Sequence, residues 1–556
     1  MTEVDDARLG SLEDALSSIQ DTQLEIYRIL QSHQAGIDDL KADNPGAIAF
    51  ETIIGLALTA LSDLEQAANG SPSEIDRQLI RFNDRILRSL EWQTDRRIAS
   101  EDAGGTLSTA RVAAEWACSR HPGRYSSPKI EEALRSVGRS LLEELPLWSR
   151  GSGNRILHVM TSAQDTGGHT RLVDRWIRFD SARTHTIVLT EQGDLPVPAW
   201  LRDHATGGVT QLQGASPAAR VTELATRMAD FDLVVLHLHP FEVVAIAACA
   251  DPAKRPPVLL LNCSDHLFWL GVGIADGVVN LRPVAASIDL ERRGVAPERS
   301  MLLPLPLDQP LRSLEPTQAK EIIGFPVESL MMLCIAPEWK FSSHFGMEFA
   351  EMIEPVLEEE DRSYLVVIGA DPAAEHWEPL ISKYGRRVHI LPPTHKTRAY
   401  MEAADIYLDS APLPSMTAVL EGALMGIPAV TLTVPELDYL GSHYFGFGVD
   451  SLPRFGSINE WRVGILSLLR DPILRRDLGA ASIQAIVQRH TPSAWLPQLE
   501  QVYECTKKRA LPPLAPIGAS FENRDLALAS FQQVAAQPRS IETLLAAHGL
   551  LPRNLT

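Results

Sequence analysis

Short apolar runs that alternate with helical segments constrain the fold of this chain more than any other feature of its sequence. One series begins at Arg155–Met160, a second begins at Met331–Ile335, and the proline-rich run Leu303–Pro310 separates them. Strands that alternate with helices pair in parallel, because each helix returns the chain across one face of the sheet. We therefore predict an α/β fold with two doubly wound, Rossmann-like domains and a ligand cleft between the carboxyl ends of their sheets.

The predicted strands set the domain boundaries. In the first series they are Arg155–Met160, His185–Leu189, Val209–Gln211, Leu233–Leu238, Pro257–Leu261 and Gly277–Leu281. In the second series they are Met331–Ile335, Tyr364–Ile368, Val388–Leu391, Ile406–Leu408 and Ala429–Leu432. We place the first α/β domain at residues 154–308, the second at 309–510, and a helical tail at 511–556.

Residues 1–145 show helical patterns and no strand signal, so an all-α domain is expected at 1–148. Its helices are predicted around Leu9–Leu30 and at Ala47–Ala68, Glu74–Ile98, Ser108–Cys118 and Lys129–Leu145. Three roles fit such a domain: a module for interaction or homo-oligomerisation, a scaffold that presents an acceptor, or a helical cap over the next domain.

The composition narrows the class of protein. A net charge of −20 argues against nucleic acid as a partner, because an extended nucleic-acid footprint needs a basic face. The five cysteines are scattered without metal-ligand spacing, which is typical of buried thiols in a reducing compartment. The first residues are acidic, unlike a signal peptide, and no apolar run is long enough to span a bilayer. We therefore expect a cytoplasmic protein.

The segment Ala404–Val430 carries the strongest signal for a binding site. Its strand Ile406–Leu408 leads through a proline-containing loop to a helix, for which Ser415 and Thr417 are good N-cap residues. A helix N-terminus beyond the carboxyl end of a parallel strand offers free N–H groups to phosphate. Glu421 lies one turn beyond Thr417 on the same face, where a carboxylate suits a ribose diol. The alternative interpretation is a surface βα unit with a solvated glutamate.

Two further junctions of the second series carry polar side chains. Lys340 follows the strand Met331–Ile335, and a lysine there can neutralise a diphosphate leaving group. Thr394 and His395 follow the strand Val388–Leu391, where exposed backbone groups can read a nucleobase. For each residue alone, an ordinary surface position is the alternative. Because these junctions are predicted to face one cleft, we interpret them as parts of one site.

Junctions of the first series carry paired glycines and histidines. Gly167 and Gly168 join the first strand to its helix, and paired glycines let the backbone approach an anion. His169 follows them and can act on an acceptor hydroxyl, because imidazole titrates near neutrality. His237 and His239 close the fourth strand, and alternation predicts that they share one side of the sheet. No third ligand stands near them, so hydrogen bonding to sugar or phosphate is favoured over metal binding.

Asp265 and His266 follow the fifth strand of the first series, directly before Leu267, Phe268 and Trp269. A polar pair beside two aromatic rings suits an acceptor-side sugar platform. A corner of the core is an equal alternative.

The interdomain passage of the sequence is similar to that of retaining GT-B glycosyltransferases. The residues that carry this similarity are Ala275–Asn280, Leu290–Arg299 and Leu303–Asp308. Gly167–His169 and Leu236–Pro240 also resemble the N-terminal loop and the histidine strand of these enzymes. Glu421 falls on the ribose-binding glutamate of the family. The other glutamate of that motif would fall at Leu413, where this sequence departs from the pattern.

The second series also resembles the O-GlcNAc transferases and the bacterial N-glucosyltransferases. Cys334–Lys340 is similar to the segment that ends in their diphosphate-binding lysine, and Leu408–Pro428 matches their spacing without a gap. The resemblance implies that Thr417 contacts phosphate and that Glu421 replaces a ribose-binding acid. Met416 stands where several members have histidine. The N-terminal helices show no tetratricopeptide signature, so the protein-acceptor domain of that group is not implied.

These resemblances imply a GT-B glycosyltransferase that moves a hexosyl or N-acetylhexosaminyl group from a nucleotide-diphosphate donor, a UDP-sugar above all, to a protein side chain. Lys340 would stabilise the departing diphosphate, so neither a metal nor another cofactor is expected. His169 and His239 would act with Lys340 in catalysis. The alternatives are a glycan, lipid or small-molecule acceptor, a nucleotide-sugar epimerase, and a non-catalytic GT-B-like assembly protein.

Overall fold

The computed structural model describes residues 72–149, 151, 153–308, 312–341, 343, 346–433, 453–508, 514, 517–535 and 541–550. The helices predicted around Leu9–Leu30 and at Ala47–Ala68 lie outside these residues. The described chain forms two compact units. The first unit runs up to Leu303 and resumes at Gln498, and the second unit is the segment Pro304–Pro497. Both predicted Rossmann-like units are present, as the resemblance to GT-B enzymes implied.

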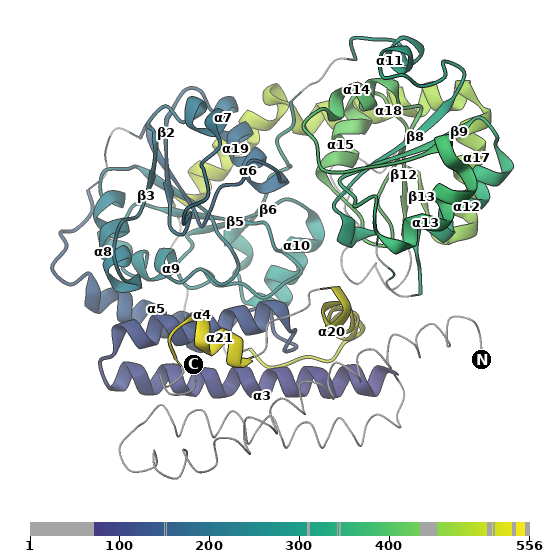
Figure 1. The fold of residues 1–556 in the computed structure, drawn as a ribbon. Coiled ribbons are helices and arrows are strands. Elements are labelled where there is room, and N and C mark those ends of the chain that lie inside the picture. The colour runs from purple at the N-terminus through teal and green to yellow at the C-terminus, as the bar shows by residue number, and fades with distance from the viewer. Residues whose placement is uncertain are drawn as a thin grey trace. The chain divides into compact units, whose positions relative to one another are not determined.

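The first unit contains a parallel sheet of seven strands in the order β3-β2-β1-β4-β5-β6-β7. Figure 1 labels β2, β3, β5 and β6 of this sheet. Its strands are β1 (Arg155–Met160), β2 (Thr184–Leu189), β3 (Val209–Gln211), β4 (Leu233–His237), β5 (Val258–Asn262), β6 (Gly277–Asn280) and β7 (Ser300–Leu302). Most are runs of buried aliphatic residues, as expected for a sheet covered on both faces. The short strand β7 is an addition to the predicted set.

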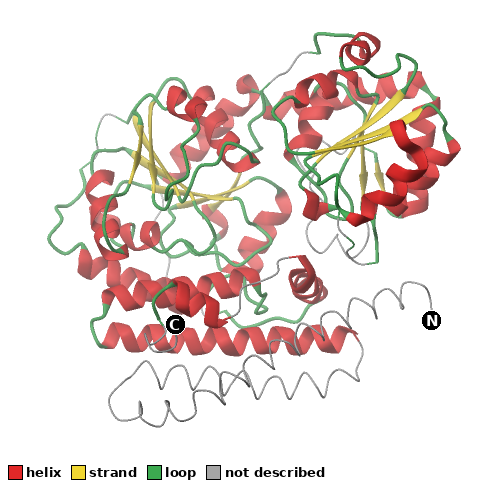
Figure 2. Cartoon of the chain, viewed as in Figure 1, coloured by secondary structure: helices red, strands yellow, loops and turns green. Residues whose placement is uncertain are grey.

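Helices cover both faces of this sheet, as Figure 2 shows. They are α6 (Gly168–Phe179), α7 (Ala199–His204), α8 (Pro217–Met228), α9 (Val244–Ala248) and α10 (Pro283–Ile288). On one face, β1 and β2 pack with α6 and α7 through a cluster that contains Met160, Val173, Ile187 and Leu201. On the other face, Leu157 and Leu236 belong to a larger core that includes α8 and α9.

The large core continues into the helices that precede the sheet. These helices are α3 (Pro72–Ala99), α4 (Ala103–Ser119) and α5 (Pro128–Leu141). The Glu131 carboxylate of α5 accepts hydrogen bonds from the backbone N–H groups of Gly271, Val272 and Gly273. The described N-terminal helices therefore belong to the same compact unit as the first sheet.

The chain after residue 517 returns to these helices (Figure 1). It forms α20 (Asn523–Ala535) and α21 (Ile541–Ala547). His121 Nε2 lies 2.9 Å from Asp525 Oδ1, and both side chains are buried. The Gln532 amide donates to the Cys118 carbonyl at 2.8 Å. The predicted helical tail thus packs on the predicted helical N-terminal region.

The second unit contains a six-stranded sheet in the order β10-β9-β8-β11-β12-β13, and every pair is parallel. Its strands are β8 (Leu330–Ile335), β9 (Ser363–Ile368), β10 (Val388–Leu391), β11 (Ile406–Leu408), β12 (Ala429–Leu432) and β13 (Arg454–Phe455). Its helices are α11 (Pro316–Ile322), α12 (Phe349–Glu359), α13 (Glu378–Tyr384), α14 (Thr397–Ala403), α15 (Thr417–Leu424), α17 (Ile458–Arg470), α18 (Pro472–His490) and α19 (Pro492–Thr506). The chain passes back to the first unit within α19.

No helix in the described part of the chain is long and apolar enough to cross a membrane.

Candidate active site

Both sheets reverse their strand order at one point, which lies between β1 and β4 in the first unit and between β8 and β11 in the second. In open α/β sheets, ligands bind beyond the carboxyl ends of the strands at such a point. Lys340 follows β8, and Asp409–Ser415 follows β11. Gly167–His169 follows β1, and His239 follows β4. Most of the predicted site residues therefore fall at the switch point of their own sheet.

Lys340 ends a 3₁₀ turn, Glu338–Lys340 (η4), that follows β8. Its Nζ donates a hydrogen bond of 2.6 Å to the Pro414 carbonyl oxygen, in the loop that precedes α15. Burial lowers the pKa of Lys340, and the nearby Asp409 carboxylate opposes that change. The Trp339 ring, which is 50% exposed, has its centroid 5.4 Å from the same nitrogen. A half-buried cation beside a helix start is suited to binding a phosphate.

Asp409 is the buried acid of this site. Its Oδ1 accepts hydrogen bonds from the backbone N–H of Ser415 at 2.7 Å and from the Ser415 hydroxyl at 3.0 Å. Its Oδ2 is buried and has no hydrogen-bond partner among the described residues. Burial raises the pKa of Asp409 to about 7, although the bonds from Ser415 and the charge of Lys340 limit the rise. Asp409 can therefore offer a ligand either an acceptor or a donor near neutral pH.

Helix α15 begins at Thr417, and its N-cap residue is Met416, which makes no side-chain capping bond. The prediction that Ser415 or Thr417 caps this helix is wrong, because the Ser415 hydroxyl is drawn to Asp409 instead. Thr417 and Glu421 are both half-buried on this helix. The first-turn N–H groups of α15 are thus left without a side-chain cap from its N-cap residue, as a phosphate site requires.

Leu413 is 5% exposed, and its carbonyl accepts a 2.7 Å hydrogen bond from the Ser410 hydroxyl. The position at which the resembling family carries a glutamate is therefore a buried apolar anchor of the loop.

Thr394 and His395 lie after β10, at the edge of the sheet and two strands from β8. The Thr394 hydroxyl accepts a 3.2 Å bond from the Lys396 N–H, which shapes the loop. His395 is exposed. The structure therefore does not bring these residues to the switch point, and their role toward a nucleobase stays a prediction.

The glycine loop of the first unit precedes α6. Gly167 has a φ of 128°, a conformation that favours glycine. A Cβ at this position would meet nothing within 4 Å, so the backbone conformation and not the available space favours glycine here. Gly168 is exposed and begins the helix. Burial, together with the nearby His239, lowers the pKa of His169 to about 4. The buried Nε2 of His169 has no hydrogen-bond partner among the described residues. His169 is thus a neutral imidazole that can act as a base.

His239 lies beyond the end of β4, so strand alternation does not determine its side. Its N–H donates a 2.9 Å bond to the Thr161 hydroxyl, and its ring packs against Phe241. Burial lowers the pKa of His239. It lines a small hollow together with the residues after β5, including Ser264. His237, by contrast, is fully buried in the sheet.

Three buried histidines form a row across β2, β1 and β4. His158 Nδ1 lies 2.9 Å from His237 Nε2, and His158 Nε2 lies 2.9 Å from His185 Nδ1. In the strand register His158 pairs with Ile187 and Val235. His185 is therefore two residues nearer the amino edge, and His237 two residues nearer the carboxyl edge. We call His185, His158 and His237 the histidine row. In the described part of the chain, no three His, Cys, Asp or Glu side chains converge to hold a metal ion.

Asp265 is buried, and both of its carboxylate oxygens accept hydrogen bonds from Arg282. Burial alone would raise the pKa of Asp265, but the charge of Arg282 holds it below its usual range. His266 Nδ1 lies 3.3 Å from the same carboxylate. Phe268 and Trp269 are buried, so they form a corner of the core rather than a sugar platform. Asp265 is thus an ionised partner of Arg282, which favours a structural role over contact with an acceptor.

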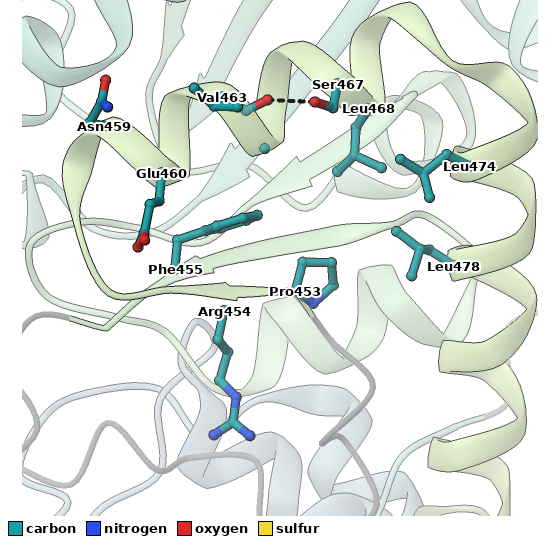
Figure 3. A pocket seen from close by; sticks show the side chains of 11 residues that line it. Pro453, Arg454, Phe455, Asn459, Glu460, Val463, Ser467, Leu468, Leu474 and Leu478 are labelled. Atoms are coloured by element: carbon teal, nitrogen blue, oxygen red, sulfur yellow. Dashed lines mark hydrogen bonds between the residues drawn. The ribbon is translucent and has the colours of Figure 1, made fainter.

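A separate hollow of the second unit lies among β13, α17 and α18, and Figure 3 shows its mostly apolar lining. The lining residues are Pro453, Arg454, Phe455, Asn459, Glu460, Val463, Gly464, Ser467, Leu468, Leu474 and Leu478. The Ser467 hydroxyl donates to the Val463 carbonyl at 2.8 Å. None of the predicted site residues lines this hollow.

Several solved glycosyltransferase structures are similar to this chain. HepE of Anabaena, in complex with UDP, is 16% identical with a TM-score of 0.49, over 63% of this chain and 99% of its own. A mutant O-GlcNAc transferase of Thermobaculum terrenum is 17% identical with a TM-score of 0.45, over 90% of this chain and 98% of its own. A glycosyltransferase of Rickettsia africae is 14% identical with a TM-score of 0.47, over 64% of this chain and 100% of its own. No family model and no curated protein matches the sequence.

Sequence reasoning missed three residues of these sites: His158, His185 and Asp409. His158 and His185 interrupt apolar strands, and Asp409 directly follows one. A titratable side chain in a buried strand must find a hydrogen-bond partner, because burying it unpaired is costly. That signal was available in the sequence.

Proposed function

We propose that this protein is a glycosyltransferase that moves a sugar from a nucleotide-diphosphate donor, and that its second unit binds the donor. The observation that carries the proposal is the Lys340 ammonium group. It is fixed to the Pro414 carbonyl before α15, beside Asp409, at the switch point of the sheet. A cation and a helix N-terminus at one place favour a bound diphosphate.

In the proposed reaction, the bond between the anomeric carbon and the β-phosphate oxygen breaks as the acceptor attacks the anomeric carbon. Negative charge grows on the departing diphosphate, where Lys340 and the first-turn N–H groups of α15, from Thr417 on, would stabilise it. These groups supply the positive charge, so we propose that transfer needs no metal. Glu421 would hold the ribose, and the loop that contains Thr394 and His395 would contact the base of a UDP-sugar.

We assign the acceptor side to the first unit. His169 lies at the switch point of its sheet, and its buried Nε2 has no hydrogen-bond partner among the described residues, so we propose that it takes the proton that the acceptor releases. His239, Gly167 and Gly168 are the proposed neighbours of the bound substrates. We propose a protein side chain as the acceptor, because the second series as a whole resembles the O-GlcNAc transferase and N-glucosyltransferase group; Cys334–Lys340 itself bears on the donor.

The test is turnover and binding with a panel of UDP-, GDP- and dTDP-sugars. We expect UDP release with a UDP-sugar, and a Kd that rises at least tenfold in Glu421→Ala by calorimetry, because the ribose contact is lost. The matched control is Glu358→Ala, which removes an exposed glutamate from α12 of the same unit. If the protein binds none of the donors, the proposed function is wrong. If Glu421→Ala leaves the UDP affinity unchanged, Glu421 does not bind the ribose.

A further inference from the structure

The hydrogen bonds of the histidine row fix the positions of its protons. His185 Nε2 lies 2.8 Å from the Asp180 carbonyl oxygen, and a carbonyl can only accept, so His185 carries its proton on Nε2. Its Nδ1 is then an acceptor, and His158 must donate to it from Nε2. By the same step, His158 Nδ1 accepts from His237 Nε2. The assignment follows from the network. It leaves His237 Nδ1 as an unprotonated nitrogen.

His237 Nδ1 is the open end of the row. The side chain is 0% exposed, and this nitrogen has no hydrogen-bond partner among the described residues. His237 is the last residue of β4, at the switch point. The His169 ring centroid lies 6.1 Å from that of His237, whereas the hydrogen-bonded pairs of the row are 5.1 and 5.2 Å apart. An approach of about 1 Å would therefore bring His169 to the spacing of the hydrogen-bonded pairs.

The other end of the row meets a carboxylate. Asp180 Oδ2 lies 3.5 Å from His185 Nε2 and accepts a 3.1 Å bond from the Tyr503 hydroxyl. Asp180 Oδ1 accepts a 2.8 Å bond from Arg183. The Trp176 N–H donates to the Tyr503 oxygen at 2.7 Å, which leaves the tyrosine proton to Asp180. Asp180 is thus held in place beside His185, where it can offset a positive charge.

We propose that the histidine row is a proton relay for the acceptor side of the transfer reaction, so this inference rests on the proposed function. As the acceptor atom bonds to the anomeric carbon, its proton passes to His169 and then to His237 Nδ1. The His237 Nε2 proton moves to His158 Nδ1, and the His158 Nε2 proton moves to His185 Nδ1. One proton enters, His237 and His158 change tautomer, and one positive charge appears on His185 beside the Asp180 carboxylate.

The charges around the row support this direction of transfer. Burial lowers the pKa of all three histidines, so the row is neutral at rest, and His237 Nδ1 is its open acceptor. The titratable or charged groups that face it are Asp180, Arg183, Tyr503 and His169. The Asp180 carboxylate acts on His185 and raises its pKa against burial. Because a buried imidazolium needs a compensating charge, the proton should settle on His185.

The first test is His158→Gln in the full chain. A glutamine amide can accept from His237 and donate to His185, but it cannot pass a proton. We expect kcat for transfer to fall roughly 10²-fold, with an unchanged KM for the donor and unchanged UDP affinity. The matched control is His389→Gln in the second unit, where a half-buried histidine bonds the Arg386 carbonyl and packs against the Phe325 ring, away from the histidine row. An unchanged kcat and pH profile in His158→Gln would overturn the relay.

The second test reads the protons directly and needs no turnover. In protein labelled with ¹⁵N-histidine, we expect all three imidazoles to be Nε2–H tautomers at pH 8. On acidification the imidazolium signal should appear at His185, and Asp180→Asn should move that step to lower pH. An imidazolium that appears at His237 while His185 stays neutral would overturn the relay. Absence of donor turnover by the wild type would instead contradict the proposed function, while the tautomers would still decide whether the row can transfer protons.

Discussion

Replacing Asp409 by asparagine tests the electrostatics of the candidate donor site. The asparagine side chain would have nearly the same shape and would keep an oxygen for the two bonds from Ser415, but it cannot ionise. In the wild type, Asp409 is buried and its pKa is raised to about 7 from an ordinary value of 3.8. The folded state therefore binds the proton more tightly than the unfolded state does. The protein is therefore more stable at low pH, where Asp409 is protonated. Its free energy of unfolding must fall as the pH rises and the folded state has to bury the ionised carboxylate.

The size of this loss follows from the two pKa values. Below pH 3.8 Asp409 is protonated in both states and has no effect on the pH dependence of stability. Between 3.8 and about 7 the free energy of unfolding falls by about 1.4 kcal/mol per pH unit, and it levels off above the folded pKa. From pH 5 to pH 8 the loss is about 3 kcal/mol. For a unit of this size, that corresponds to roughly 6–12 °C in Tm.

The assay is thermal unfolding of wild type and Asp409→Asn at pH 5 and pH 8. From pH 5 to pH 8, the Tm of Asp409→Asn should rise relative to that of the wild type by roughly 6–12 °C, because the variant has no carboxyl group to ionise at this site. Asp361→Asn, which changes an exposed aspartate of the same unit, is the control and should follow the wild type at both pH values. If the difference in Tm between wild type and Asp409→Asn is the same at both pH values, Asp409 does not titrate as its burial requires.

Three further substitutions test other contacts. Lys340→Met should lower kcat with the donor at least roughly 10²-fold, because the leaving group loses its cation, and near-normal turnover would remove that role. Arg282→Met leaves the Asp265 carboxylate buried without its partner and should cost about 3–5 kcal/mol in chemical denaturation; a cost under about 1 kcal/mol would refute the structural role. In Gly422→Ala the new methyl group would lie 2.8 Å from the Tyr407 ring. The variant should lose about 1–3 kcal/mol of stability, and an unchanged Tm would show that α15 can shift without cost.

The sequence predicted the strands whose own residues favour a buried strand, without reference to their neighbours in the sheet. Arg155–Met160 and Leu330–Ile335 are mostly apolar runs of 6 residues between turn signals, a length and pattern typical of a buried parallel strand. Ser300–Leu302 and Arg454–Phe455 were missed because they are short and exist by pairing to the neighbouring strands β6 and β12. Their conformation depends on tertiary pairing more than on their own residues.

The sequence predicted those residues of the candidate site that directly follow a strand, because ligand sites of α/β folds form at such junctions. Lys340 and Ser415 were found because both follow strands at the carboxyl edge. The capping prediction failed at Ser415, because no local pattern shows that a hydroxyl will bond a carboxylate six residues earlier. His158 and His185 meet through a register offset between two strands. That offset depends on strand order, which an unaligned sequence does not give.

The return of the chain within α19 has a consequence for synthesis and for truncation. The second unit, Pro304–Pro497, is an insertion that the first unit surrounds in sequence. The Tyr503 hydroxyl, which bonds the Asp180 carboxylate, therefore leaves the ribosome only after the whole inserted unit. A protein cut short before Gln498 would have every strand of the first sheet, yet the aspartate beside the histidine row would lack its tyrosine. A deletion of Pro304–Pro497 alone would retain both Asp180 and Tyr503.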